Sequence, residues 1–371
     1  MKKLEIITGG EKITSRQLMY FVACYILGGT LLTSLIVSVT KQDSWLAVIL
    51  GFAVSALIAW LILTLAQNFP GKTLIQINDI VFGNVLGKTL SVIYILFFLI
   101  GACLDIRDIG NFLTGLIMPE TPLVAIFTLF VFVCGYGVFN GILVLARCSF
   151  IIVVILLSVL LFDTLLLIPN MNFANFAPAF TLPLRSYIQG IHTMSLIPFD
   201  GVLTLLMIFP SVDQKVSLKK PIFIGILIGT IAMLVAVIRD WAVLGSTMPM
   251  MTSPSFQALS LINVAEVFTR MEIFGAAALM AIRFFRSSVQ YYAFTYSISQ
   301  LFHLRSYKPL VIICGIIIIC VSAFLFASSM EMGYFGTNIG AVFNTFFIVI
   351  LPAITLITAR TKGLGKKGRK E

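Results

Sequence analysis

The chain has 371 residues, of which 59% are hydrophobic and only 11% are charged, and its formal net charge is +10. Soluble domains carry roughly 25% charged residues, and a soluble fold of this length could not bury so much apolar surface. An integral membrane protein exposes such surface to lipid. The composition therefore excludes a soluble globular protein and predicts an all-α integral membrane protein.

A membrane-spanning helix needs about 20 predominantly apolar residues, and by this measure the sequence predicts about ten transmembrane helices. They are expected at 17–39, 45–66, 89–112, 122–139, 143–168, 186–209, 221–244, 268–300, 309–328 and 337–358. The link at 169–185 is rich in Pro, Asn and Phe and is expected at the membrane interface. The link at 245–267 has room for a short surface helix.

The charges orient these spans. An even number of spans places both termini on one side, and with that side inside, most Lys and Arg fall in cytoplasmic loops, as the positive-inside rule requires. The sequence therefore predicts a cytoplasmic N-terminal segment at 1–16, a transmembrane domain at 17–358 and a basic cytoplasmic tail at 359–371. The tail is expected to meet anionic lipid, not nucleic acid.

Two spans contain helix-breaking residues at matching positions. Span one carries Gly28-Gly29-Thr30, and span six carries Pro198, Asp200 and Gly201. Glycine is a poor helix former and proline removes a backbone donor. Matched interruptions in two halves of a transporter mark inverted repeats around a binding site. The sequence therefore predicts a 5+5 inverted-repeat bundle with repeats at about 17–168 and 186–358 and with broken helices 1 and 6.

Unwound backbone within the membrane must find polar partners, and a ligand can supply them. Half-helix N-termini favour a carboxylate, whereas freed carbonyls favour a cation, so an amino acid suits both. The predicted ligand-binding residues are Gly28, Gly29, Thr30, Thr33, Ile197, Pro198, Phe199, Asp200 and Gly201, with Asp200 expected to meet an ammonium group. The alternative is structural, because glycine also allows close helix packing and proline also kinks helices.

Span eight carries two arginines, Arg283 and Arg286, which share one helix face because they are three residues apart. In this architecture span eight packs near span one, where many related transporters hold sodium. Ser287 could hold an ion, or an arginine beside it could replace the ion or act in gating. The alternative is a structural ion pair with Asp163 or Asp200. Asp105 and Asp108 are expected either to end span three or to form a gate.

Other chemistry finds no support in the sequence. The six cysteines form no CxxC pair, the two histidines are far apart, and no nucleotide-binding loop, HExxH motif or nucleophile elbow occurs. We therefore expect no cofactor, no metal centre and no enzymatic activity.

The ordered set of short motifs resembles the B subunits of bacterial spore germinant receptors, which are endospore germination permeases of the amino acid–polyamine–organocation superfamily. The matching features are Ile13-Thr14-Ser15-Arg16-Gln17, Gly28, Gln42-Asp43 with Trp45, Gly201 with the run ending at Pro210, Arg270 with Glu272, and LPAITLITAR before the Lys-rich tail. Asp200 and the Arg283/Arg286 pair lie outside this pattern and leave the ligand class open.

This resemblance implies a ten-helix bundle of the leucine-transporter type in the spore inner membrane, assembled with the A and C subunits of a receptor. Such a subunit would sense a small-molecule germinant, foremost an amino acid, and start germination. Two alternatives stay open at this stage. One is a secondary active transporter of amino acids or amines, and the other is a water or ion conduit of the receptor complex.

Overall fold

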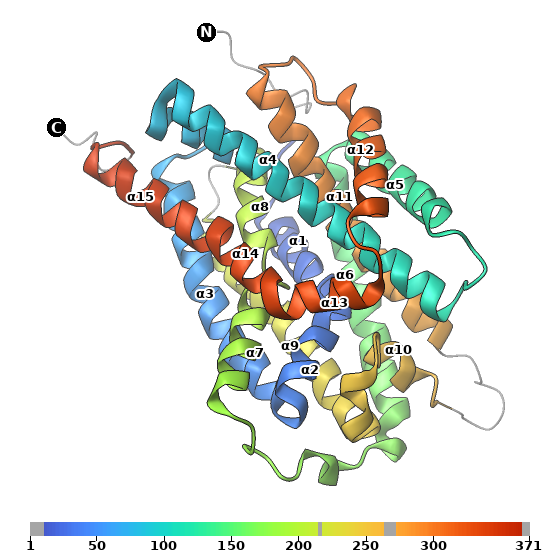
Figure 1. Cartoon of the computed structure of the whole chain (residues 1–371). Helices are drawn as coiled ribbons and strands as arrows, with labels where there is room; N and C mark the ends of the chain where they lie inside the picture. The colour runs from blue at the N-terminus through green and yellow to red at the C-terminus, as the bar shows by residue number, and fades with distance from the viewer. Residues whose placement is uncertain (1–10, 214–216, 263–271, 366–371) are drawn as a thin grey trace.

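The computed structural model describes residues 11–213, 217–262 and 272–365. It is a bundle of helices standing roughly alongside one another (Figure 1). The first half of the chain forms α1 (Ser15–Leu27), α2 (Thr33–Thr40), α3 (Ser44–Asn68), α4 (Leu74–Leu116), α5 (Leu123–Asn140) and α6 (Ile142–Leu167). The second half forms α7 (Leu184–Leu196), α8 (Gly201–Ile208), α9 (Lys219–Leu244), α10 (Pro254–Leu259), α11 (Glu272–Leu301), α12 (Leu310–Phe324), α13 (Ser329–Phe335), α14 (Ala341–Thr345) and α15 (Leu351–Thr361).

Helix occupies each of the ten predicted stretches, although positions 268–271 of the eighth lie outside the described residues. Within the described ranges, seven continuous helical stretches are long and apolar enough to cross a membrane on length and composition. The chain is therefore a multi-pass integral membrane protein, and the number of ten crossings stays a prediction. Spans one and six are each two helices, as predicted, and the last span includes two π-helical turns, at Gly336–Gly340 and Phe346–Ile350.

The first half-helix, α1, is central to the bundle. It is buried over most of its length, from Phe21 to Leu27, and packs against α9, α6 and α11. A helix that is apolar all round belongs inside a bundle. Thr14 and Gln17 begin it with a capping box, in which each side chain bonds the backbone of the other residue. The Thr-Ser-Arg-Gln motif of the sequence therefore has a structural role in starting span one.

The described ends of the chain lie at the same end of the bundle. Ile13 pairs with the segment after α8, donating its N–H to Ser211 O at 2.9 Å. A shallow cavity at that end is lined by residues of 66–72 and 209–218, and Gly365 packs on Asn68 of the same end. This placement is what an even number of crossings requires, whereas the cytoplasmic location of that end stays a prediction.

Span three departs from its predicted range of 89–112. The structure gives one long element, α4, that begins at Leu74 and reaches Leu116, with a kink at Gly83 (φ 80°). The positive φ explains the glycine, because other residues rarely adopt it. The hydropathy of the sequence does not show that the residues from Leu74 to the predicted start of span three at 89 are also helical. Asp105 and Arg107 are consequently buried within the bundle, whereas the predicted end of the span at 112 would place them near the membrane surface.

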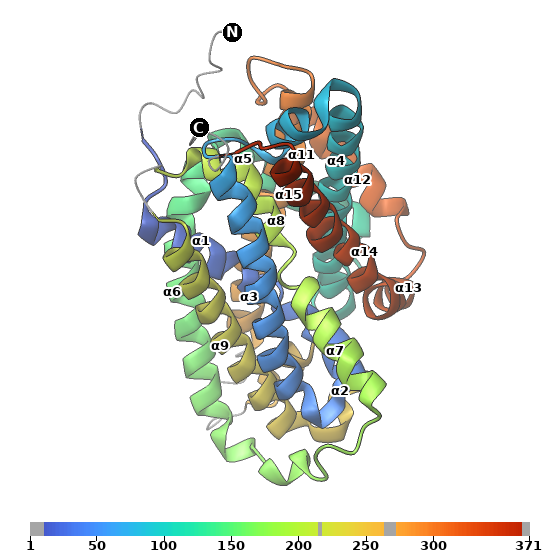
Figure 2. The same ribbon diagram turned by 90° about the vertical axis from the view of Figure 1, so that its left-hand side faces the viewer.

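The link at 169–185 forms a loop at one end of the bundle (Figure 2). Two residues of the α2–α3 turn hold it. Gln42 Nε2 donates to Pro178 O at 2.8 Å, and Asp43 Oδ2 accepts from Phe180 N–H at 3.0 Å and from Tyr187 Oη at 2.7 Å. Asp43 is fully buried. Gln42 and Asp43 thus attach this loop to the start of the second span.

We expect Asp43→Ala to loosen this loop by about 1–3 kcal/mol, because the Phe180 amide and the Tyr187 hydroxyl both lose their acceptor. Hydrogen exchange over 171–183 should report the change, with faster exchange there than elsewhere. Asp43→Asn keeps one acceptor oxygen and should have a smaller effect. Equal exchange in Asp43→Ala and the unaltered protein would contradict this role.

Candidate functional site

The two helix breaks lie against each other. Span one stops at Leu27, passes through Gly28 and Gly29 into a 3-10 turn at Thr30–Leu32, and resumes at Thr33. Span six stops at Leu196 and resumes at Gly201. A Cβ on Gly29 would lie 2.8 Å from Pro198 Cβ, and a Cβ on Gly201 would lie 2.0 Å from Tyr25 Cε1. The glycines are therefore what lets the two breaks approach.

The backbone amides of the first break donate hydrogen bonds to carbonyls of the preceding helix, α1. Gly28 N–H donates to Cys24 O at 3.1 Å, and Gly29 N–H donates to Ile26 O at 2.8 Å. The carbonyls of the second break are also engaged. Arg286 Nη2 donates to Ile197 O and Nη1 donates to Pro198 O, each at 3.1 Å. The freed carbonyls thus meet a cation, as expected, and this cation belongs to the chain.

Arg286 is the hub of a buried ionic cluster. Its Nη2 also donates to Asp200 Oδ1 at 2.8 Å, and its Nε donates to Asp105 Oδ1 at 3.0 Å. The guanidinium carbon lies 4.8 Å from the centre of the Tyr25 ring, within the range of a cation–π contact. Gly28 packs on the stem of this side chain, since a Cβ there would lie 2.8 Å from Arg286 Cβ. One side chain therefore connects spans one, three, six and eight.

Arg283 extends the cluster one turn along α11. Its Nη1 donates to Asp105 Oδ1 at 2.9 Å, and its Nη2 pairs with Asp108. Arg283 is fully buried, and the Asp105 side chain is 6% exposed. Two arginines three residues apart thus face two aspartates three residues apart on α4. Buried charges in such a setting need partners, because desolvation costs several kcal/mol per ion.

Asp200 also accepts hydrogen bonds from two uncharged polar groups, Tyr25 and Gln290. Tyr25 Oη donates to Asp200 Oδ1 at 3.0 Å, and Gln290 Nε2 donates to Tyr25 Oη at 2.6 Å. Thr204 Oγ1 in turn donates to Gln290 Oε1 at 3.3 Å. This chain of bonds orients the Asp200 carboxylate and links α1, α8 and α11.

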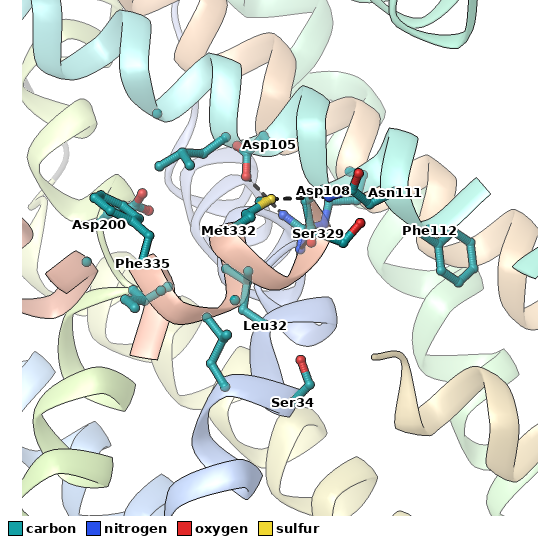
Figure 3. Close-up of a pocket in the computed structure, with 18 of the residues that line it drawn as sticks. Leu32, Ser34, Asp105, Asp108, Asn111, Phe112, Asp200, Ser329, Met332 and Phe335 are labelled. Carbon is teal, nitrogen blue, oxygen red and sulfur yellow. Dashed lines mark hydrogen bonds and ion pairs between the residues drawn. The ribbon is translucent and has the colours of Figure 1, made fainter. Parts of the chain in front are cut away.

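A cavity of about 250 Å³ opens beside this cluster. Figure 3 shows Asp105, Asp108 and Asn111 of α4 on one side, Leu32 and Ser34 of span one on another, and Met332 and Phe335 of α13 lying over it. Its charged lining residues are Asp105, Asp108, Asp200, Arg283 and Arg286. Three carboxylates against two guanidiniums leave the site with one excess negative charge. Phe97 and Phe343, which stack at 5.9 Å, form part of its apolar wall.

The predicted site residues fall into four groups. Four of them line the cavity: Ile197, Asp200, Arg283 and Arg286. Those that lie behind this lining and shape the breaks are Gly28, Gly29, Thr33, Pro198, Phe199 and Gly201. Thr30 lines a separate, smaller cavity. Ser287 is buried and its hydroxyl has no hydrogen-bond partner among the described residues.

The contacts of Arg286 bear on both interpretations, and its role stays a prediction. This arginine lies against the freed carbonyls, where a bound cation was expected, and it also forms the ion pair with Asp200. Neither arginine pairs with Asp163 within the described part of the chain. The expectation that Asp105 and Asp108 end span three is wrong, because the helix continues to Leu116 and both carboxylates pair inside the bundle.

Sequence reasoning missed four members of the site. Asp105 and Asp108 carried a usable signal, since their spacing of three matches that of Arg283 and Arg286 on another apolar helix. In a chain with few charges, an acidic pair and a basic pair with the same spacing are expected to form ion pairs between two neighbouring helices. Tyr25 and Gln290 carried no comparable signal, because single polar residues occur in many membrane helices.

Comparison with known proteins agrees with this architecture. The family model for spore germination proteins matches residues 12–331. Spore germination protein KB of Bacillus subtilis strain 168 is 25% identical over 370 residues, covering 97% of this chain and 99% of the relative. Spore germination protein B2 of the same organism is 22% identical over 344 residues, covering 90% of this chain and 92% of the relative.

Solved transporters share the fold. The structure of Mhp1, a nucleobase-cation-symport-1 family transporter in a closed conformation with bromovinylhydantoin bound, superposes with a TM-score of 0.69 at 13% identity, covering 95% of this chain and 81% of that one. MhsT in complex with L-phenylalanine gives a TM-score of 0.57 at 14% identity, covering 96% and 90%.

These likenesses confirm the predicted leucine-transporter type of fold, with its two broken helices. They are to transport and germination proteins and not to enzymes, as the sequence predicted. Because the family model covers most of its length, the chain belongs to the spore germination protein family.

Proposed function

We propose that this chain is the germinant-sensing membrane subunit of a spore germinant receptor, and that it binds a small nutrient, foremost an amino acid, beside the two helix breaks. The observation that carries the proposal is the cavity lined by the ionic cluster at these breaks. Ligand sites of this fold class lie at broken helices near the middle of the membrane. The cavity is smaller than the range of about 300–1,000 Å³ that drug-sized ligands occupy, which favours a metabolite of amino acid size.

Charge favours a ligand that carries an ammonium group. The cluster has one more carboxylate than guanidinium, and Asp108 and Asp200 keep the most exposed carboxylate side chains, at 22% and 11%. An ammonium group at one of these carboxylates would neutralise the excess negative charge and gain charge-assisted hydrogen bonds. The apolar remainder of the ligand would lie against Phe97 and Phe343. In this arrangement Gly28, Gly29 and Gly201 act indirectly, by letting the breaks dock.

Binding would act by shifting a conformational equilibrium. A ligand changes the balance between two states only if it binds one of them more tightly. Arg286 contacts both breaks and α4, so a ligand at Asp200 or Asp108 would compete for the carboxylates that hold these elements together. We propose that the loosened cluster transmits the signal to the A and C subunits of a receptor in the spore inner membrane. Both termini would then face the cytoplasm.

A second candidate function is secondary active transport of amino acids or amines. The observation that favours it is the fold, which is that of the transporter Mhp1 over 95% of this chain. Net uptake separates the two functions. In proteoliposomes, a sensing subunit should bind the nutrient saturably without net accumulation of labelled ligand, whereas a transporter should accumulate it.

The proposal as a whole is tested by complementation in spores that lack their own copy of this subunit. Restored germination with an amino acid or amine, lost when Asp200→Asn replaces the unaltered chain at equal membrane levels, is the expected result. The Asp200→Asn side chain keeps the shape and removes the charge that an ammonium requires. An unchanged nutrient response in Asp200→Asn would contradict the proposed binding mode.

A further inference from the structure

A second cavity lies away from the ionic cluster. It has a volume of about 50 Å³ and is lined by residues of the first break and of α6, α9, α10 and α11. The lining residues with polar side chains are Thr30, Asp163, Arg239 and Ser255. Because one water molecule needs about 10–15 Å³ of such space, this cavity has room for a monovalent ion or a few waters.

Two oxygen atoms at this cavity have no partner. Asp163 is 2% exposed, and its Oδ1 is buried without a hydrogen bond to any described residue. The hydroxyl of Thr30 is likewise buried and unpartnered. An isolated buried carboxylate is so costly that it normally takes up a proton, a paired charge or a metal ion. This carboxylate therefore calls for a positive charge that the described side chains do not supply.

The cationic side chain that lines this cavity, Arg239, already forms an ion pair with Asp240. Arg239 donates through Nε to Asp240 Oδ1 at 2.9 Å and lies 2.8 Å from the same atom through Nη2. Asp240 also accepts from Ser255. Arg239 and Asp240 of α9 are the charges that act on Asp163. Asp163, Arg239 and Asp240 together thus carry one uncompensated negative charge.

The backbone adds to the attraction for a cation. Leu27, the last residue of α1, lines the same cavity. The C-terminal end of a helix carries a partial negative charge, which stabilises a nearby cation. The site differs from the one that the sequence suggested beside Ser287, because it lies toward the other end of α11, at Gly275, Ala278 and Leu279.

We propose that Asp163 and Thr30 form a second binding site, for a monovalent cation or a proton, separate from the nutrient cavity. A single positive charge neutralises the cluster, and the space is large enough for a monovalent ion. Because Thr30 belongs to the first break, occupancy stabilises the geometry on which the nutrient cavity depends. This inference does not rest on the nutrient, since the site has its own residues and is measured without one.

The test is thermal unfolding of the purified full-length protein in choline chloride, sodium chloride and potassium chloride of equal ionic strength, at mildly acidic and mildly alkaline pH. A cation site gives a saturable rise in melting temperature, about 2–4 °C, with sodium or potassium over choline. A proton site gives equal melting temperatures in the three salts and a pH dependence. Asp163→Asn should abolish whichever response is seen, and Thr30→Val should weaken the cation response.

Two controls match these variants. Glu120→Gln removes an exposed acid from the loop before α5, and Thr164→Val removes a hydroxyl that already donates to Leu160 O at 2.6 Å. Both should respond as the unaltered protein does. Equal responses of Asp163→Asn and the unaltered protein to salt and pH would overturn the proposal and leave the cavity to water. If Asp163→Asn fails to fold, Thr30→Val decides, because a cation response equal to that of the unaltered protein in this variant would overturn the cation site.

Discussion

Arg286→Met is expected to lower the free energy of unfolding by about 3–5 kcal/mol, because removing one partner of a buried ion pair leaves the other charge uncompensated. Here Asp200 loses the guanidinium that it pairs with, and Asp105 keeps that of Arg283 alone. The carbonyls of Ile197 and Pro198 lose their donors as well. Thermal unfolding of the purified variant measures the loss, and the ligand response should disappear with it.

Arg147 provides the matched control. It pairs with Glu11 on the surface, where the two side chains are 56% and 67% exposed, and exposed pairs contribute less than about 1 kcal/mol. Arg147→Met should therefore unfold close to the unaltered protein. Adding Asp200→Asn to Arg286→Met should recover part of the stability, because the double variant no longer leaves that carboxylate unpaired. Similar unfolding of Arg286→Met and Arg147→Met would show that the ionic cluster does not hold the breaks together.

Gly201→Ala is expected to abolish the nutrient response while the protein still reaches the membrane. The added methyl would lie 2.0 Å from the Tyr25 ring, and that ring cannot turn away without losing its bonds to Asp200 and Gln290. Spans one and six must therefore move apart, at a cost of about 1–3 kcal/mol. We expect the affinity for the ligand to fall at least about tenfold, which corresponds to 1.4 kcal/mol.

Gly135→Ala is the appropriate comparison for this variant. Gly135 lies within α5, and a Cβ there would meet its nearest neighbour, Tyr291 Cε1, at 3.5 Å, which is ordinary contact. This variant should bind ligand and support germination normally. Normal responses in both variants would show that the approach of the two breaks is not needed for binding.

The broken helices could be predicted because the cause is local. Gly28 and Gly29 weaken a helix, and Pro198 stops one, wherever the segment lies. Their matched positions then predicted the architecture, which the fold confirms. The capping residues Thr14 and Gln17 were equally local signals. Features of this kind depend on a few neighbouring residues, so a single sequence is enough to find them.

The ionic cluster could be predicted only in part, because its pairs join residues 86 to 181 positions apart. Asp200 and Arg286 drew attention as single charges in apolar helices, but nothing local shows which carboxylate faces which arginine. The prediction also failed to give the full length of α4. A hydropathy window placed the end of span three at 112, so Asp105 and Asp108 seemed terminal, whereas the helix continues to Leu116 and carries them inward.

The most direct measurement of the central claim is equilibrium binding of a matched pair of ligands to the purified protein. A panel of amino acids and amines, followed by thermal unfolding, first finds one that stabilises the chain. That ligand is then compared with its analogue in which a hydroxyl replaces the ammonium group. The account predicts saturable binding of the ammonium compound alone, lost in both Asp200→Asn and Gly201→Ala. Equal binding of the two compounds, or full binding in Asp200→Asn, would contradict it.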